Sequence, residues 1–252
     1  MENLLVEDDT INMKHKENKT CKLTPRLQLI ADMVPAGTRV ADIGTDHAYI
    51  PIYLVTKGIA TYAIASDVRP GPVGKALENV KKYGLTNSID IRLGNGLETI
   101  KPGEVDVIII AGMGGILITD ILTASKRVLN NIKRLILQPM IAQEEVRRWL
   151  AENHFIIADE ALAAEGHKIY NIIAAEPGDE KIEKEIYYSV GKKLIEKRDP
   201  LLGTWLIKSI NTMERILMQM EDKDSNNVCI LREEFKKKIW EYEKIKKMIE
   251  KE

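Results

Sequence analysis

The chain has 252 residues, of which 44% are hydrophobic and 30% are charged, and its formal net charge is -1. This composition excludes a disordered or fibrous protein, and the near-neutral charge gives no global attraction to nucleic acid. No segment approaches the roughly 20 apolar residues that a membrane span requires. Cys21 and Cys229 are far apart and lack metal-ligand spacing, so we expect reduced thiols in a cytoplasmic protein.

Residues 1–22 are polar and lack the basic and apolar regions of a secretory signal, so we expect a polar, disordered leader. From Leu23 onward, apolar residues with helical spacing predict a helix that ends at "VPAGT". Short β-branched runs bounded by turn residues then alternate with helical patterns. The runs predict strands at 38–44, 61–68, 89–94, 105–112 and 134–140, and the patterns between them predict helices near 48–58, 71–84, 115–130 and 143–153.

Five strands separated by helices predict a mostly parallel sheet with helices on both faces. Two further strands are predicted at 154–163 and 167–177, with only a short turn between them. Since that turn is too short for a crossover, the last strand should run antiparallel to its neighbour. We therefore expect an α/β, Rossmann-like domain over 23–178 with a seven-stranded sheet.

The composition changes after "EPGDE" (176–180), and we expect a separate helical domain over 179–252. Apolar residues there step by three and four, which is the spacing of a coiled-coil seam, and the polar turn "EDKDSNN" (221–227) separates two such seams. The pattern predicts an antiparallel coiled-coil hairpin. Two roles stay open: a solvated packing hairpin, or a substrate-binding arm with a basic stripe beside three aromatic residues. The first seam comprises Leu206, Ile210, Met213, Leu217 and Met220; the second comprises Val228, Leu231, Phe235, Tyr242, Ile245 and Ile249, with Lys238 at a core position.

The first strand ends in a loop, "DIGTDHAY", with a single turn glycine. Gly44 permits the sharp turn into a helix whose N-terminus faces a ligand, and Asp67 closes the second strand, where a carboxylate accepts from ribose hydroxyls. These positions indicate an adenosine-containing cofactor. A dinucleotide pyrophosphate suits G-x-G-x-x-G, but Asp46 occupies the second glycine's position and would repel it. The acid favours S-adenosyl-L-methionine, which carries an amino group and a sulfonium, and an antiparallel last strand is typical of class I methyltransferases.

Seven short stretches follow one another along the chain in a recognisable order: "LTPRLQLIADMV", "VADIGTDHAYIP", "ASDVRPGP", "RLGNGL", "AGMGG", "LQP" and "EGHKIY". The ordered set resembles that of the bacterial tRNA (adenine-22, ring nitrogen 1)-methyltransferase family. The resemblance covers Leu23 to about Pro177, and the helical hairpin follows in the expected place. The sequence departs from the family at two positions, where "GNGL" replaces "GDGL" and "LQPM" replaces "LQPN".

The resemblance implies an enzyme that forms 1-methyladenosine in tRNA with S-adenosyl-L-methionine. Asn95, which replaces an aspartate, keeps an acceptor oxygen, so cofactor binding should weaken rather than be lost. Met140 replaces an asparagine, which shifts attention to Gln138 and Pro139. The positions implied to hold the cofactor are Asp42, Gly44, Asp67, Val68, Asn95, Gly96, Gly112 and Met113.

Ring nitrogen 1 of adenine is already nucleophilic, so methyl transfer depends mainly on positioning. The product base is cationic, and Asp46 is our first candidate to stabilise that charge. Tyr49 or Tyr170 offers an aromatic face to a base that has left its stack, and His47 lies beside them in the loop. Helix capping or core packing stays open for His47 and Tyr49. Arg26 and Lys168 are candidates for phosphate contacts, with solvated surface charge as the alternative.

We therefore expect tRNA as the partner, no metal, no membrane association and a monomer. Two alternatives stay open at this point. One is a class I methyltransferase acting on a protein or small molecule, with the hairpin as a dimer interface. The other is a non-catalytic RNA-binding protein that retains a vestigial cofactor pocket.

Overall fold

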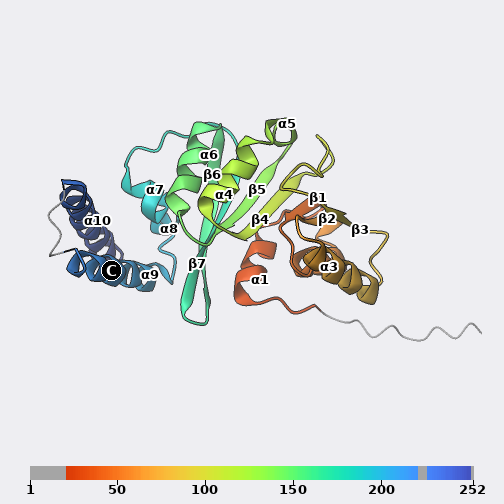
Figure 1. Ribbon diagram of the computed structural model, residues 1–252, viewed down its shortest axis with the longest axis horizontal. Coiled ribbons are helices and arrows are strands. Elements are labelled where there is room, and N and C mark those ends of the chain that lie inside the picture. Colours follow the sequence, from red (N-terminus) through yellow and green to blue (C-terminus); the bar gives the residue numbers. More distant parts are fainter. Residues whose placement is uncertain (1–20, 221–225, 251–252) are drawn as a thin grey trace, which may run out of the picture.

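The computed structural model describes residues 21–220 and 226–250, and a seven-stranded sheet forms its centre (Figure 1). The predicted leader, except Cys21 and Lys22, and most of the predicted turn at 221–227 lie outside the described residues. The strands are β1 (Thr38–Ile43), β2 (Ala60–Asp67), β3 (Ile89–Leu93), β4 (Val107–Met113), β5 (Arg134–Pro139), β6 (Phe155–Glu165) and β7 (Lys168–Pro177).

The strand order is β3-β2-β1-β4-β5-β7-β6. The first five strands pair in parallel, and β7 runs antiparallel to both β5 and β6. The predicted seven-stranded sheet with an antiparallel last strand is therefore confirmed. The order reverses between β1 and β4, which is where ligands bind in open sheets of this kind.

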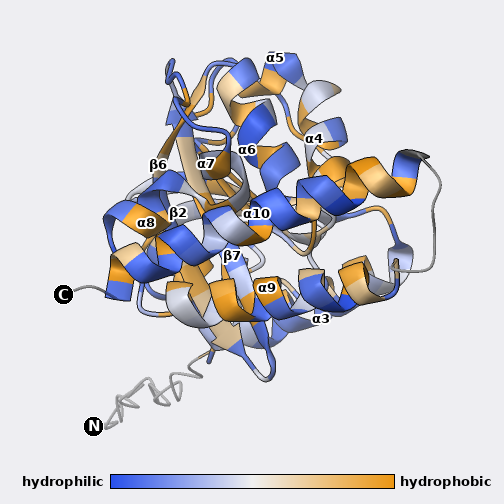
Figure 2. Cartoon of the chain, turned by 90° about the vertical axis from the view of Figure 1, so that its left-hand side faces the viewer, coloured by the Kyte–Doolittle hydropathy of each residue, from blue (hydrophilic) through white to orange (hydrophobic). Residues whose placement is uncertain are grey.

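Helices precede, separate and follow the strands. Two of them, α9 and α10, run side by side at one end of the molecule (Figures 1 and 2). The helices are α1 (Pro25–Asp32), α2 (Tyr49–Thr56), α3 (Pro70–Tyr83), α4 (Gly115–Thr123), α5 (Lys126–Leu129), α6 (Gln143–Glu152), α7 (Ile186–Val190), α8 (Lys192–Glu196), α9 (Leu202–Met218) and α10 (Asn226–Glu250).

Both faces of the sheet are buried, as the unbroken apolar run of β4 requires. Ile108 and Ile110 pack under α4, α5 and α6, whereas Val107 and Ile109 face the opposite layer with α1 and α2. Successive side chains of a strand point to opposite faces, so one strand supplies both cores. The sheet is thus held rigidly from both sides, and its strand ends are fixed in space.

The prediction of a single helix at 115–130 is wrong, because the chain forms two helices there, α4 and α5. Ser125 lies between them with a φ of -124°, which is outside the helical region. The break turns α5 so that both Val128 and Leu129 enter the core beside Ile132. The demand for burial at three nearly consecutive positions overrides the helical pattern read from the sequence.

The residues from α7 to α10 form what we call the helical arm. Two short helices, α7 and α8, precede the hairpin and were not anticipated from the sequence. Leu206, Ile210 and Met213 of α9 are buried with Tyr242 and Ile245 of α10, so the predicted seam is confirmed at its centre. The same core includes Leu162 of β6, Val190 of α7 and Leu194 of α8, so the hairpin also packs against these elements.

A buried ion pair joins the arm to the sheet. Arg147 of α6 donates from Nε to Glu160 Oε1 at 2.7 Å, and both side chains are fully buried. The same guanidinium donates to the carbonyl of Tyr188 in the arm and to Asn171 Oδ1 of β7. Gly191 must be glycine here, because an added Cβ would lie 2.6 Å from Glu160 Oε2. These contacts fix the direction in which the arm leaves the sheet.

Candidate active site

The loop after β1 is tied down by its backbone. The amides of Gly44 and Thr45 donate to the Ser66 carbonyl of β2 at 2.7 and 2.9 Å. Gly44 has a φ of 76°, and a Cβ at this position would collide with Cε of Met113. The positive φ favours glycine, and the contact with the flexible end of Met113 shows that the loop after β1 lies close to the end of β4.

Asp42 is a buried carboxylate at the end of β1. Burial raises the pKa of Asp42 to about 6, although the hydroxyl of Thr45 and the positive charge of Arg26 oppose the rise. No ion pair joins Asp42 to a basic side chain within the described ranges. A buried carboxylate without a paired cation is costly to the free protein and suits a ligand that brings a positive charge.

The three unusual side chains of the loop lie together. Nε2 of His47 is 3.0 Å from Asp46 Oδ2, and the His47 and Tyr49 rings stack with centroids 5.1 Å apart. The side chain of Asp46 is 62% exposed, and Tyr49 is 42% exposed at the start of α2. The His47 carbonyl accepts from Asn79 Nδ2 at 3.0 Å, which anchors the group to α3. Tyr49 is therefore no core residue: its ring stacks against His47 and remains partly exposed to solvent.

The ends of β2 and β3 supply the other predicted cofactor residues. Asp67 is buried, and its Oδ1 accepts from the backbone amide of Arg69 at 2.8 Å. Val68 and Asn95 are exposed, and the Asn95 amide is 3.5 Å from Glu98 Oε1. Gly96 has a φ of 52° and lies against Ile121. All four lie at the edge where parallel strands end.

Gln138 connects the loops after β4 and β5. Its Oε1 accepts from Arg26 Nη1 at 2.7 Å and from the Gly112 amide at 3.2 Å. Its Nε2 donates to the Pro139 carbonyl at 3.1 Å and lies 3.6 Å from Met140 Sδ. The side chain is fully buried, so one amide group sets the geometry of both loops.

Two backbone bonds complete this side of the site. The amide of Met140 donates to the Met113 carbonyl at 2.8 Å, and the amide of Gly115 donates to the Ile141 carbonyl at 2.9 Å. A Cβ on Gly115 would collide with the Ala142 carbonyl. Gly115 therefore serves tight packing of the N-terminus of α4, which is the alternative to an approach by a flat base.

The predicted substrate-binding residues divide into two groups. Arg26 lies over the Tyr170 ring at 5.3 Å from its centroid, and its Nε is 3.7 Å from Glu165 Oε2. With its bond to Gln138, Arg26 is engaged on three sides. Lys168 is exposed on β7 near Tyr170. Contact of Arg26 with a tRNA phosphate stays a prediction, and the structure gives this residue a second role inside the protein.

Thr45 and Glu165 are parts of the site that the sequence analysis did not single out. The Thr45 hydroxyl accepts from the Ala48 amide at 3.1 Å, which allows Ala48 to adopt a φ of 55°. Thr45 lies three residues before Ala48, the residue that precedes α2, and a threonine hydroxyl that accepts from a nearby backbone amide is a local turn signal available in the sequence. Glu165 could be recognised as part of the site only from the structure, because the fold brings it to Arg26.

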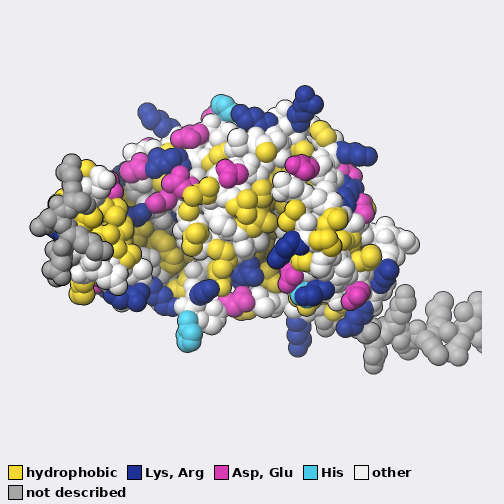
Figure 3. Space-filling model, viewed as in Figure 1, with side chains coloured by type: hydrophobic (Ala, Val, Ile, Leu, Met, Phe, Trp, Pro, Cys, Tyr) yellow, Lys and Arg dark blue, Asp and Glu magenta, His cyan; other side chains and the backbone are white. Residues whose placement is uncertain are grey.

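Hydrophobic side chains gather on the face drawn in Figure 3, over the middle of the molecule where α4 lies. Ile116 and Leu117 of α4 and Ile141 of the loop after β5 are exposed there. They border the Gln138 loops, so the apolar surface and the predicted base site are neighbours. Contiguous exposed apolar patches on a protein surface commonly mark interaction sites.

None of the helices in 21–220 and 226–250 is long and apolar enough to cross a membrane. In the same ranges no group of three or more His, Cys, Asp or Glu side chains is arranged to hold a metal ion.

The sheet order, the glycine turn after β1 and the acids at the ends of β1 and β2 define a Rossmann-like methyltransferase. A family model described as a methyltransferase domain matches residues 23–173. The curated tRNA (adenine(22)-N(1))-methyltransferase of Bacillus subtilis is 47% identical over 158 residues, which are 63% of this chain and 66% of that protein. The aligned region thus spans just under two thirds of that relative.

Solved structures extend the match through the arm. The structure of the B. subtilis M1A22 tRNA methyltransferase TrmK has a TM-score of 0.83 and 35% identity, and the match covers 90% of this chain and 99% of that one. A Streptococcus pneumoniae structure, titled a putative tRNA (m1A22) methyltransferase in complex with S-adenosyl-L-methionine, has a TM-score of 0.81 and 34% identity, and covers 89% and 100%. The chain belongs to the tRNA (adenine(22)-N(1))-methyltransferase family.

Proposed function

We propose that this protein transfers a methyl group from S-adenosyl-L-methionine to ring nitrogen 1 of adenine 22 in tRNA, in the cytoplasm. The observation that carries the proposal is the arrangement of residues at the carboxyl ends of β1 and β4, where the strand order reverses. A buried, unpaired carboxylate and a glycine turn occupy one side of this edge, and two loops fixed by Gln138 occupy the other. Family membership supports both the methyl donor and the base.

The residues at the ends of β1 and β2 fit the cofactor. Asp42 lacks a cation, and the amino group of S-adenosyl-L-methionine supplies one. Asp67 has a carboxylate at the position that accepts ribose hydroxyls in this fold. Val68, Asn95 and Gly96 would surround the adenine, and the β4 loop at Gly112 and Met113 would pass the methionine portion. When bound, the cofactor supplies an electrophilic methyl group on a sulfonium.

The base side acts by positioning. The lone pair of ring nitrogen 1 lies in the plane of adenine, so the base must enter edge-on and in line with the bond that breaks. Gln138, with Pro139 behind it, holds the two loops that flank this approach. Tyr49 presents an open ring on which an unstacked base can rest. The end of β4 and the start of α4 read "AGMGG" (111–115) and lack the Asn or Asp followed by Pro-Pro that amino-group methylases carry, which favours the ring nitrogen.

Asp46 is our candidate for stabilising the product. Methylation at ring nitrogen 1 leaves a positive charge on the base, and a carboxylate near that charge lowers the barrier. Asp46 is exposed and its carboxylate is directed by His47 at 3.0 Å, so it is available to a base arriving from solvent. His47 in this proposal orients Asp46 and contacts no base.

The central experiment identifies the modified nucleoside. Unmodified tRNA is incubated with the protein and labelled S-adenosyl-L-methionine, then digested and separated. We expect 1-methyladenosine, and a tRNA with guanine in place of adenine 22 should accept no label. Label on another base, or only on protein, would contradict the proposed substrate and leave the methyltransferase fold intact.

Asp46→Ala separates the two possible roles of this side chain. We expect turnover to fall by about tenfold to a hundredfold, with unchanged affinity for S-adenosyl-L-methionine by calorimetry. Asp46→Asn keeps the shape and removes the charge, so it should resemble alanine. An equal loss of affinity and turnover would assign Asp46 to the cofactor instead. His47→Gln is the matched test of orientation and should lose less turnover than Asp46→Ala.

A further inference from the structure

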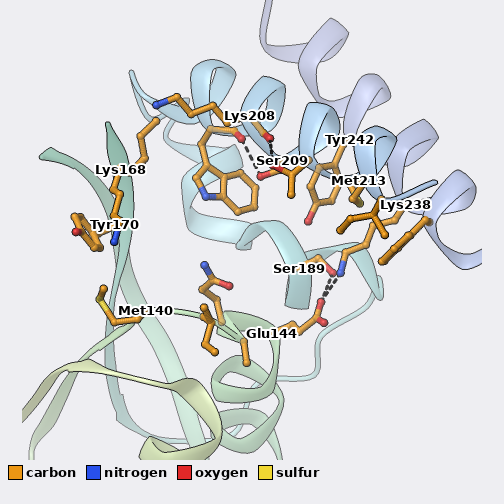
Figure 4. A pocket seen from close by; sticks show the side chains of 18 of the residues that line it. Met140, Glu144, Lys168, Tyr170, Ser189, Lys208, Ser209, Met213, Lys238 and Tyr242 are labelled. Carbon is orange, nitrogen blue, oxygen red and sulfur yellow. Dashed lines mark hydrogen bonds and ion pairs between the residues drawn. The ribbon is translucent and has the colours of Figure 1, made fainter. Parts of the chain in front are cut away.

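A recess of about 690 Å³ lies between the sheet and the helical arm (Figure 4). Met140 of the loop after β5 and Tyr170 of β7 form the side that faces the candidate active site. Ser209 and Met213 of α9 and Lys238 of α10 close the opposite side. Met140 Sδ lies 3.6 Å from Gln138 Nε2, so the recess begins where the predicted base site ends.

The charged residues of the recess are mainly basic. Its lining includes three lysines, Lys168, Lys208 and Lys238, and one acid, Glu144, which is a surplus of two positive charges with histidine neutral. Lys238 Nζ lies 2.6 Å from Glu144 Oε2, and Lys208 Nζ donates to the His167 carbonyl at 2.8 Å. In the described part of the chain Lys168 forms no ion pair. The recess is therefore suited to an anionic ligand.

Aromatic and polarisable side chains complete the lining. Tyr170 of β7 and Phe235 of α10 are partly exposed in the lining, whereas Trp205, Tyr242 and Met213 lie behind it, buried in the core of the arm. Aromatic faces beside lysines are the combination that binds unpaired nucleotides, because the rings stack with a base and the ammonium groups meet its phosphate. A volume of about 690 Å³ suits a group of that size, and is too small for a folded partner segment.

We infer that this recess binds the unpaired nucleotide next to the target adenine in the tRNA strand. The inference rests on the proposed function and adds a second nucleotide site to it. An adenine that leaves its stack to reach the sheet edge takes a stacking partner away from its neighbour. The recess offers that neighbour an aromatic wall, with Lys168 and Lys208 at its phosphate. The helical arm then acts as one wall of a substrate site that the sheet alone does not complete.

Filling the recess is the direct test. Ser209→Phe places a ring inside it, and Ser209→Ala is the matched control that leaves it open. We expect Ser209→Phe to raise the KM for tRNA by about tenfold or more, since stacking of one base contributes about that factor. Affinity for S-adenosyl-L-methionine should stay unchanged in both variants, which also reports correct folding. Thr212→Trp, from an exposed position one turn further along α9, is the second filling variant.

A fluorescent base locates the nucleotide. The full-length protein is mixed with tRNA that carries 2-aminopurine on either side of adenine 22, and emission is followed. We expect a change at one of these positions with wild type and with Ser209→Ala, and none with Ser209→Phe. Lys208→Ala should reduce the salt dependence of tRNA binding by about one unit of slope, whereas Lys82→Ala, exposed on α3 outside the recess, should not.

The outcomes separate the two proposals. Wild type that forms no 1-methyladenosine at position 22 rejects the proposed function before any variant is compared. Wild type that forms it, with filled variants whose KM for tRNA stays within twofold, overturns the recess as a nucleotide site and leaves the proposed function standing. A raised KM in both filled variants, with normal cofactor affinity and a lost 2-aminopurine signal, establishes it.

Discussion

Two buried carboxylates in different regions of this molecule have different surroundings. Glu160 of β6, at the joint between sheet and arm, bonds Arg147 at 2.7 Å and accepts from the Lys193 amide at 3.2 Å. Asp42, at the end of β1, has the Thr45 hydroxyl and the distant charge of Arg26. Burial raises the pKa of both, and in Glu160 Arg147 opposes the rise directly.

The difference separates a structural carboxylate from one kept for a ligand. At Glu160 the protein supplies the counter-charge itself, because the joint must be fixed before any substrate arrives. At Asp42 the protein supplies no paired counter-charge. The free protein therefore carries an unfavourable buried charge, which a cationic ligand would neutralise. Substitutions at the two places should therefore act on different quantities: folding at the joint, and binding at the strand end.

The largest effect is expected at the joint. Arg147→Met leaves Glu160 buried and unpaired, and we expect the free energy of unfolding to fall by about 3–5 kcal/mol in urea titrations. Glu160→Leu added to it removes the unpaired charge and should recover much of the loss. A single variant that loses under about 1 kcal/mol would show that the joint does not depend on this pair.

The second effect concerns Asp42→Asn, which should act in opposite directions on stability and binding. At pH 7.5 we expect the free energy of unfolding to rise by about 1–3 kcal/mol, because a pKa shift of about two units corresponds to that range. Affinity for S-adenosyl-L-methionine should fall about tenfold or more by calorimetry, since a charge-assisted hydrogen bond is lost.

The stability difference between Asp42→Asn and the wild type should depend on pH in a defined direction. The pKa of Asp42 is raised in the folded state, so its protonated form contributes stability below the ordinary value of 3.8, and that contribution is lost as pH rises through about 6. The advantage of Asp42→Asn should therefore grow between pH 4 and pH 7 in urea titrations. A constant difference across this window would mean that Asp42 titrates normally.

A smaller effect is expected for Gly44→Ala, for which the chain offers a matched control. Gly44 and Gly37 have φ values of 76° and 77°, but an added Cβ meets Met113 at the first and nothing within 4 Å at the second. Gly37→Ala should cost about 1 kcal/mol from backbone strain alone. Gly44→Ala should cost more in thermal unfolding and also weaken cofactor binding. Equal costs would remove the argument for close approach of the two loops.

The smallest effect is expected for Lys238→Met. This residue interrupts the predicted seam of α10, and the structure explains it, because Nζ reaches Glu144 Oε2 at 2.6 Å. Both side chains are partly exposed, so we expect a change of under about 1 kcal/mol in unfolding. A loss comparable with that of Arg147→Met would show that the two ties between sheet and arm are equivalent.

Much of the fold could be predicted from the sequence. Continuous β-branched runs such as "VDVIIIAG" occur in strands buried on both faces, and the short link at 166–167 required an antiparallel pair. The break at Ser125 and the short helices α7 and α8 were missed. Both features depend on tertiary packing. The break lets Val128 and Leu129 enter the core, and α7 and α8 flank Gly191, which lies against the buried ion pair. The domain boundary near 178 stays a prediction.

The candidate site divides in the same way. Asp42, Gly44 and Asp67 could be found because strand ends in a parallel sheet meet at one edge, whatever the details of packing. The partners of Arg26 could not, since Gln138 and Glu165 lie far along the chain and only the fold brings them to it. The roles assigned to Asp46, His47 and Tyr49 stay predictions, although the structure places them in one cluster.

The sequence by itself determined the class of sheet, the order of its helices and strands, and the acids and glycine at its ligand-binding edge. These follow from local rules: the period of apolar residues, the length of connections and the turns that glycine allows. Only the tertiary structure decided which carboxylate is paired, how Gln138 joins two loops, and that α9 and α10 close a recess beside the site. Such facts depend on contacts between residues distant in the chain, which no local pattern encodes.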